Sequence, residues 1–240
     1  MKRFYSMLLK YGILPIADMA MSTSIFASFR QIKTMKYWHR DEIVKWQNNQ
    51  LQILLKHAYN HTRYYKELFD QYGIQPQDIA SCGDLQKLPV LRKEDVRNRY
   101  NDLIPDNLAS IPFIKQTTGG SSGDPVPFLL DRRSWSFSNA NMILNWERAG
   151  YHYGEKYVAL GSTSLFVNKK RSYKHILYYH LKSKIGLSGI NMSDDVCQNF
   201  VELVRKRKIR YIYGYASSIY LFAKYVLRKQ IKLNIIACFP

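Results

Sequence analysis

The sequence has few cysteines, and their spacing matches no paired-cysteine motif. Cys82, Cys197 and Cys238 lie far apart, and no C-x-x-C pair occurs. This argues against a zinc knuckle and against a disulfide framework. No metal ligand set is predicted, and a reducing, cytoplasmic location is expected.

Long apolar runs are also missing, which matters most at the N-terminus. Residues 1–3 are basic and 11–29 is fairly apolar, but Pro15 and Asp18 interrupt it. The run is too short and too polar to span a membrane, so no transmembrane segment is expected. A peripheral membrane contact with basic flanks stays open as an alternative.

Acidic residues are scarce: 18 Asp and Glu stand against 36 Lys and Arg, for a net charge of +18. Such a balance attracts nucleic acid, anionic lipid or anionic metabolites. Basic residues gather at 169–171 and 205–208, with tyrosines such as Tyr211 nearby, a mixture typical of single-strand nucleic-acid grooves. No known nucleic-acid motif accompanies them. We therefore favour a helix with a solvated basic face and a tyrosine in a strand core, with no specific nucleic acid partner. A non-catalytic basic module for nucleic acid or another anionic polymer remains the alternative function.

The 240 residues are 46% hydrophobic, enough to bury a core. Ser193 and either Ser217 or Ser218 are expected to cap helices, and Gly150 to end one. Strands that alternate with helices predict an α/β fold: an N-terminal helical region, then part of a layered, mostly parallel sheet with flanking helices. The expected helices are 41–69 with a break at Thr62, 93–101, 133–150, 193–208 and 219–229, and the expected strands include 157–162, 209–213 and 233–240.

The most informative segment is the run of small polar residues between two extended stretches. It consists of Thr117, Thr118, Gly119, Gly120, Ser121, Ser122 and Gly123, followed by Asp124, Pro125 and Val126. Glycine lets backbone N–H groups turn inward towards a ligand, and Ser and Thr add hydroxyl donors. Such a loop can surround an oligophosphate without a charged side chain. The segment therefore predicts polyphosphate binding.

Three alternatives apply to the same loop. G-x-S-x-G matches the nucleophile elbow of serine hydrolases, which needs a helix directly after the Ser. Here Pro127 would fall inside that helix, at a cost of about 3 kcal/mol. The Walker phosphate loop fails for the same reason and also lacks its Lys. A flexible polar surface turn is the third alternative.

Residues 117–125 resemble the phosphate-binding signature of adenylate-forming enzymes, Ser/Thr-Ser/Thr-Gly-Ser/Thr-Ser/Thr-Gly-x-Pro. The similarity is greater to the branch of phenylacetate–coenzyme A ligases and CapK-like proteins, where the Lys after the Pro is often absent; here Val126 stands there. Residues 51–66 resemble that branch's L-x-x-L-L-x-H-A-Y-x-x-x-x-Y-Y helix, 84–95 its D-L-x-x-L-P-x-L-x-K-E-D segment, and 214–223 its G-Y-P-S-x-x-Y-x-L-A turn.

The resemblance runs from about residue 40 onwards, so we expect 1–35 to be an unassigned segment and 36–240 a partial N-terminal domain with its phosphate loop at 117–126. It implies ATP-dependent activation of a carboxylic acid to an acyl-adenylate and transfer to a thiol such as coenzyme A, with Mg²⁺ as counter-ion, in capsular or surface polysaccharide synthesis. In the family the metal ligand and adenine pocket follow the matched part. We therefore expect a truncated chain that is inactive alone. The acid substrate, the catalytic residues and the oligomeric state are left open.

The other titratable residues predict no catalytic or metal site. His57 and His61 would share a helix face, but Ala58 breaks the H-E-x-x-H zinc pattern, so packing is favoured. The pairs Asp41-Glu42 and Asp194-Asp195 lie where helices should begin, which the helix dipole explains. His152, His175 and His180 receive no role.

Overall fold

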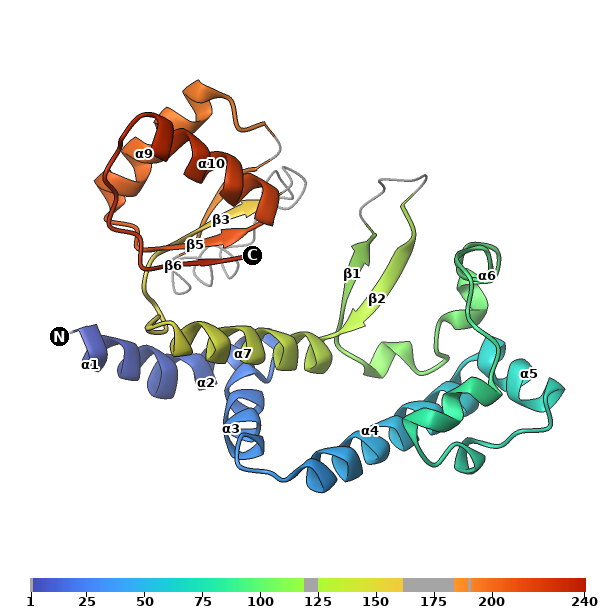
Figure 1. Cartoon of the computed structure of the whole chain (residues 1–240). Helices are drawn as coiled ribbons and strands as arrows, with labels where there is room; N and C mark the ends of the chain where they lie inside the picture. The colour runs from blue at the N-terminus through green and yellow to red at the C-terminus, as the bar shows by residue number, and fades with distance from the viewer. Residues whose placement is uncertain (1, 119–124, 162–183, 190) are drawn as a thin grey trace. The chain divides into compact units, whose positions relative to one another are not determined.

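The computed structural model describes residues 2–118, 125–161, 184–189 and 191–240 (Figure 1). They divide into two compact units, one of Met1–Phe26 with Asn139–Pro240 and the other of Ala27–Ser138. Helix α3, Ile25–Met35, begins in the first unit and continues in the second. Among the described residues, no helix combines the length and apolar character needed to cross a bilayer.

The unit of Ala27–Ser138 is built on two consecutive helices, α4 (Arg40–His61) and α5 (Arg63–Gln71). Leu55 and Phe69 pack with Ile79 into its core. The predicted break at Thr62 is confirmed, since this residue is extended with φ −123°. Thr62 occupies the N-cap position of α5, but its hydroxyl donates to the Ala58 carbonyl oxygen at 2.7 Å and makes no capping hydrogen bond with α5.

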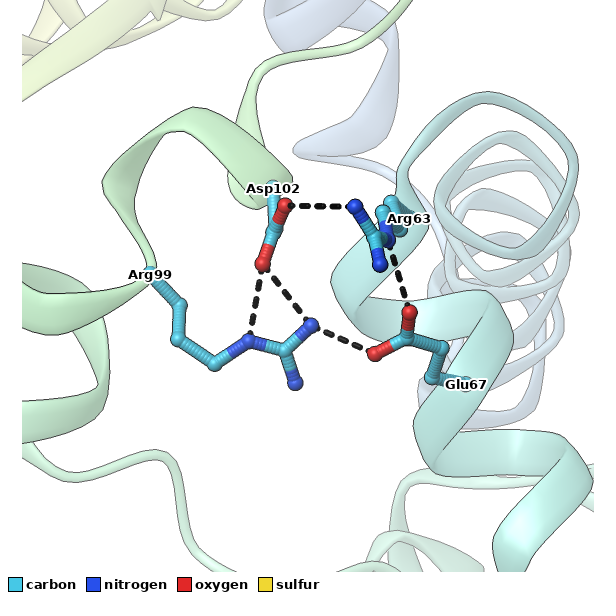
Figure 2. A network of polar contacts seen from close by, with 4 residues as sticks. All are labelled: Arg63, Glu67, Arg99 and Asp102. Carbon is cyan, nitrogen blue, oxygen red and sulfur yellow. Dashed lines mark hydrogen bonds and ion pairs between the residues drawn. The ribbon is translucent and has the colours of Figure 1, made fainter.

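Short elements follow α5, and a network of ion pairs connects one of them, η4, to α5 (Figure 2). They are η2 (Pro76–Asp78), η3 (Cys82–Lys87), α6 (Lys93–Asn98), η4 (Tyr100–Leu103) and η5 (Leu108–Ser110). Arg63 Nε donates to Glu67 at 2.8 Å, and Arg99 binds both Glu67 and Asp102. The network therefore fixes η4 against α5. Two antiparallel strands complete this unit, β1 (Phe113–Thr117) and β2 (Pro127–Asp131).

The other unit contains a four-stranded parallel sheet. Its strands are β3 (Tyr157–Gly161), β4 (Lys184–Ser188), β5 (Tyr211–Gly214) and β6 (Ala237–Phe239), in the order β4-β3-β5-β6. β3 pairs with β4 on one side and with β5 on the other. The predicted parallel α/β fold is confirmed, but the last strand is shorter than predicted and β4 was not predicted at all.

Helices cover both faces of this sheet (Figure 1). On one face Val158 and Ile212 pack with α9 (Asp194–Arg207) and α10 (Ala216–Arg228). On the other, Tyr157 and Tyr211 pack around Trp146 of α7 (Arg132–Arg148). Successive strand residues point to opposite faces, which is why the fully buried β3 serves both cores.

The helix ends test the start and stop signals that were read from the local sequence. Gly150 follows α7 with φ +84°, as predicted. Ser193 occupies the N-cap position of α9, as predicted, but its side chain makes no capping hydrogen bond. Helix α10 begins earlier than predicted, after Tyr215. The Ser218 hydroxyl donates to the Gly189 carbonyl oxygen at 2.7 Å, so Ser218 ties α10 to the end of β4 and is not a cap.

The first unit starts with three consecutive helical segments, α1 (Lys2–Met7), the π-helix η1 (Leu8–Ile13) and α2 (Leu14–Met21). Ser22, in the left-handed region with φ 51°, ends them. Lys10 forms an ion pair with Glu147 of α7, which holds these helices beside α7 (Figure 1).

Candidate functional site

The predicted phosphate loop leaves the end of a β-hairpin. Thr117 lies opposite Pro127 in the antiparallel pair of β1 and β2. One step further, the Thr118 N–H donates to the Val126 carbonyl oxygen at 2.9 Å, and the Val126 N–H donates to Thr118 Oγ1 at 3.0 Å. The two ends of the loop are therefore held together by a pair of hydrogen bonds.

The hydroxyl of Thr118 has a double role in this geometry. A hydroxyl has one donor and two acceptor sites, and Oγ1 already accepts from Val126. Its own O–H donates to no residue in the described part of the chain, and an anion could accept from it. Thr117 and Thr118 are both exposed at the hairpin end, while Gly119, Gly120, Ser121, Ser122 and Gly123 lie outside the described residues.

The strand after the loop excludes two of the alternative motifs, the nucleophile elbow and the Walker loop. The nucleophile elbow and the Walker loop both continue into a helix. Here Pro127–Asp131 forms β2, which runs back along β1. The loop is therefore a hairpin loop and neither of these two motifs.

A second candidate site lies in the other unit, at the carboxyl edge of the parallel sheet. The strand order places β4 and β5 on opposite sides of β3, so the chain changes direction across the sheet there. Ligands of α/β proteins bind at such switch points. A pocket of about 250 Å³ is found at this edge, lined by the ends of β3 and β5 with Lys184, Tyr215, Ala216 and Pro240.

Close backbone packing shapes this edge. A Cβ on Gly214 would lie 2.2 Å from the carbonyl oxygen of Leu160, so only glycine fits at the end of β5. The Gly189 N–H donates to the Gly161 carbonyl oxygen at 2.8 Å. The glycine of the G-Y-A-S-S segment is thus explained by strand packing beside the pocket.

The basic residues near the C-terminal end of α9 line a separate groove of about 480 Å³. Four cations contribute to it, namely Arg205, Lys208, Arg210 and Lys232. Tyr211 is only 1% exposed and packs in the core, so it cannot stack on a base. The predicted core position of this tyrosine is confirmed, while 169–171 lies outside the described residues.

The remaining candidates have structural contacts. The rings of His57 and His61 lie 4.9 Å apart, and His61 Nδ1 is 2.8 Å from Asp106. Asp41-Glu42 and Asp194-Asp195 lie in the first turns of α4 and α9, as predicted. Within the described ranges, no three His, Cys, Asp or Glu side chains are grouped closely enough to hold a metal ion. The histidines at 175 and 180 lie outside these ranges.

Perturbed pKa values lie away from both candidate sites. Hydrogen bonds from Lys87 and Ser81 lower the pKa of Asp84 to about 2. Burial raises the pKa of Tyr153 and of Tyr151. None of these groups is among the described residues that line the switch-point pocket or that close the hairpin loop.

Comparison with known proteins gives three informative matches. Protein CapK of Staphylococcus aureus is 21% identical over 214 residues, which are 88% of this chain and 46% of CapK. The phenylacetate–coenzyme A ligase of Escherichia coli K12 is 32% identical over 90 residues, 36% of this chain and 20% of the ligase. The crystal structure of 2-hydroxyisobutyryl-CoA ligase with 2-HIB-AMP and CoA superposes with a TM-score of 0.58 at 20% identity, covering 80% of this chain and 41% of that one.

The chain resembles the N-terminal part of the adenylate-forming enzymes. Its relatives lie in the branch of CapK and the phenylacetate–coenzyme A ligases, as the motifs predicted. No family model matches the sequence. The chain spans less than half the length of each of the three proteins, and the likeness to the ligase structure establishes the fold alone. The predicted α/β fold, a parallel sheet with flanking helices, is confirmed.

Proposed function

We propose that the chain carries the phosphate-binding part of an ATP-dependent acid–thiol ligase. Such an enzyme activates a carboxylic acid to an acyl-adenylate and transfers the acyl group to a thiol such as coenzyme A. The observation that carries the proposal is the Thr/Ser/Gly loop closed by hydrogen bonds between Thr118 and Val126. The names of the relatives, two of which are CoA ligases, support it.

In this proposal the residues from Thr117 to Gly123 bind the β- and γ-phosphates of ATP and stabilise the pyrophosphate that leaves. They offer neutral hydroxyl and N–H donors, which can be aimed at developing charge without reorganisation. The Thr118 hydroxyl lies at the end of this loop, where it accepts from the Val126 N–H and can donate to a phosphate oxygen.

The proposal names a pocket for the acid substrate and no site for the metal ion. The switch-point pocket, with Leu160, Tyr213 and Tyr215 in its wall, suits the apolar part of an acyl or aryl acid. ATP of this enzyme class is used with Mg²⁺, and the described residues contain no group of three or more His, Cys, Asp or Glu that could hold a metal ion. We therefore propose no reaction step that involves the metal ion. A role in capsular or surface polysaccharide synthesis is proposed from the CapK likeness alone.

The division into 1–35 and 36–240 also remains a proposal. Since the matched residues make up less than half of each relative, we expect these residues to bind phosphate but not to complete adenylation. An adenine pocket and a closing domain that excludes water are further requirements of this chemistry. Conversion of ATP to AMP by this chain with any carboxylic acid would contradict that expectation.

The proposal is tested by pyrophosphate binding to the chain, measured by titration calorimetry. Replacement of Gly120 or Gly123 by Val should abolish binding, because a branched Cβ prevents positive φ and close approach of the backbone. Gly83→Val is the matched control, since Gly83 has room for a Cβ in the same unit. Equal affinity of wild type and both loop variants would remove the loop from the mechanism.

A further inference from the structure

The N-terminal helices present an apolar face to solvent. Six large apolar side chains along Lys2–Met21 are exposed: Phe4 is 75% exposed, Met7 59%, Leu8 52%, Tyr11 50%, Ile16 69% and Met19 84%. Single apolar residues scattered over a protein surface are normal, but six within three consecutive helical segments indicate an interaction site.

The two charged residues between Phe4 and Met21 are buried. Lys10 is only 6% exposed and is paired with Glu147. Asp18 is 7% exposed and accepts from the Thr23 hydroxyl at 2.6 Å and the Phe26 N–H at 2.7 Å. From Phe4 to Met21 these two are the only charged residues. The outer face can therefore enter an apolar phase without desolvating a charge.

The charge around this face limits what can cover it. Asp18 is the only acidic residue among the first forty, whereas Lys2 and Arg3 directly precede the face in sequence. Most of the net charge of +18 also belongs to the unit that contains these helices. A second copy would bring the same positive charge and be repelled. An anionic surface is attracted instead.

We propose that the face formed by Phe4, Leu8, Ile16, Met19 and their neighbours docks on a membrane rich in anionic lipid. The helices would lie in the plane of the interface, with the apolar stripe among the acyl chains and the basic flanks at the headgroups. The buried charges of Lys10 and Asp18 hold the helices to the rest of the unit, through Glu147 of α7 and Phe26 at the start of α3. This docking does not depend on the ligase chemistry.

The test is sedimentation of the full chain with vesicles of phosphatidylcholine alone and of phosphatidylcholine with phosphatidylglycerol. The wild type should bind the anionic vesicles at least about tenfold more strongly than the neutral ones. The double variant Ile16→Gln, Met19→Gln should lose about tenfold or more of that affinity, because binding scales with the apolar area buried. Both side chains are exposed, so the fold should be unaffected.

A matched control replaces two equally exposed apolar residues elsewhere, Val90→Gln with Leu227→Gln, which are 83% and 77% exposed. This variant should bind vesicles like the wild type. Equal binding by the two double variants would overturn the proposal. The absence of vesicle binding by the wild type would also overturn it. A third contrary outcome is a wild-type dimer in sedimentation equilibrium that the Ile16→Gln, Met19→Gln variant does not form, while neither protein binds lipid.

Discussion

The Thr118 hydroxyl gives the sharpest test of the hairpin loop. Val has nearly the same shape as Thr but no hydroxyl, whereas Ser keeps the hydroxyl and loses only a methyl group. Thr118→Val therefore removes the donor available for phosphate and the acceptor of the Val126 N–H. Thr118→Ser retains both.

The expected effect follows from the charge of the ligand. A hydrogen bond to a charged group contributes about 1.5–3 kcal/mol, and each 1.4 kcal/mol is a factor of ten in affinity. Thr118→Val should thus weaken pyrophosphate binding about 10- to 100-fold. It should also lower stability by about 1 kcal/mol or more, since Val126 is buried and its N–H loses a partner.

Titration calorimetry with pyrophosphate, next to thermal unfolding of the same samples, separates the two effects. Thr118→Ser should stay within a few-fold of wild type in affinity. If Thr118→Val binds pyrophosphate as tightly as Thr118→Ser, the hydroxyl does not contact phosphate. The role assigned to Thr118 would then be wrong.

Three further changes test the fold. Gly214→Ala should destabilise the protein by about 3 kcal/mol in denaturant unfolding, because its Cβ would meet the Leu160 backbone at 2.2 Å; a normal midpoint would disprove this packing. Glu67→Gln should lower the thermal midpoint at low salt and have no effect at 1 M salt, since its partners Arg63 and Arg99 are exposed; a salt-independent loss would contradict the ionic explanation. The folded-state pKa of Asp84 is lowered to about 2, so its contribution to stability is present above the ordinary pKa near 4 and is lost as pH falls towards 2. Unfolding of Asp84→Asn should accordingly vary less with pH in that window than wild type, and equal pH profiles would refute the assignment.

Local sequence signals predicted the elements whose stability is local. The break at Thr62, the end of α7 at Gly150 and the start of α9 after Ser193 all depend on a few neighbouring residues. The fully buried strand Tyr157–Gly161 was predicted because all its residues are apolar or small.

Elements held by distant partners were missed. β4 contains Lys184 and Gly186 and has no apolar run, and its parallel pairing with β3 makes it a strand. Ser218 resembles a helix cap in sequence, but its hydroxyl donates to Gly189, far away in the chain. At the site, the sequence predicted strands on both sides of the loop. It could not predict that the Thr118 hydroxyl would close the hairpin on Val126, because that contact depends on the register of β1 and β2.

The tryptophans give each compact unit its own optical signal. The ring of Trp146 is surrounded by Tyr151, Tyr157 and Tyr213 and stacks on Phe239 at 4.7 Å. Trp46 stacks on Phe137 at 5.7 Å in the other unit. Fixed aromatic packing produces near-ultraviolet circular dichroism that disappears when tertiary packing is lost. Trp146 is the one tryptophan of the unit of Met1–Phe26 with Asn139–Pro240, whereas Trp38, Trp46 and Trp135 belong to the other unit. The signal that is lost when Trp146 is replaced therefore reports the unfolding of the first unit in an intact chain.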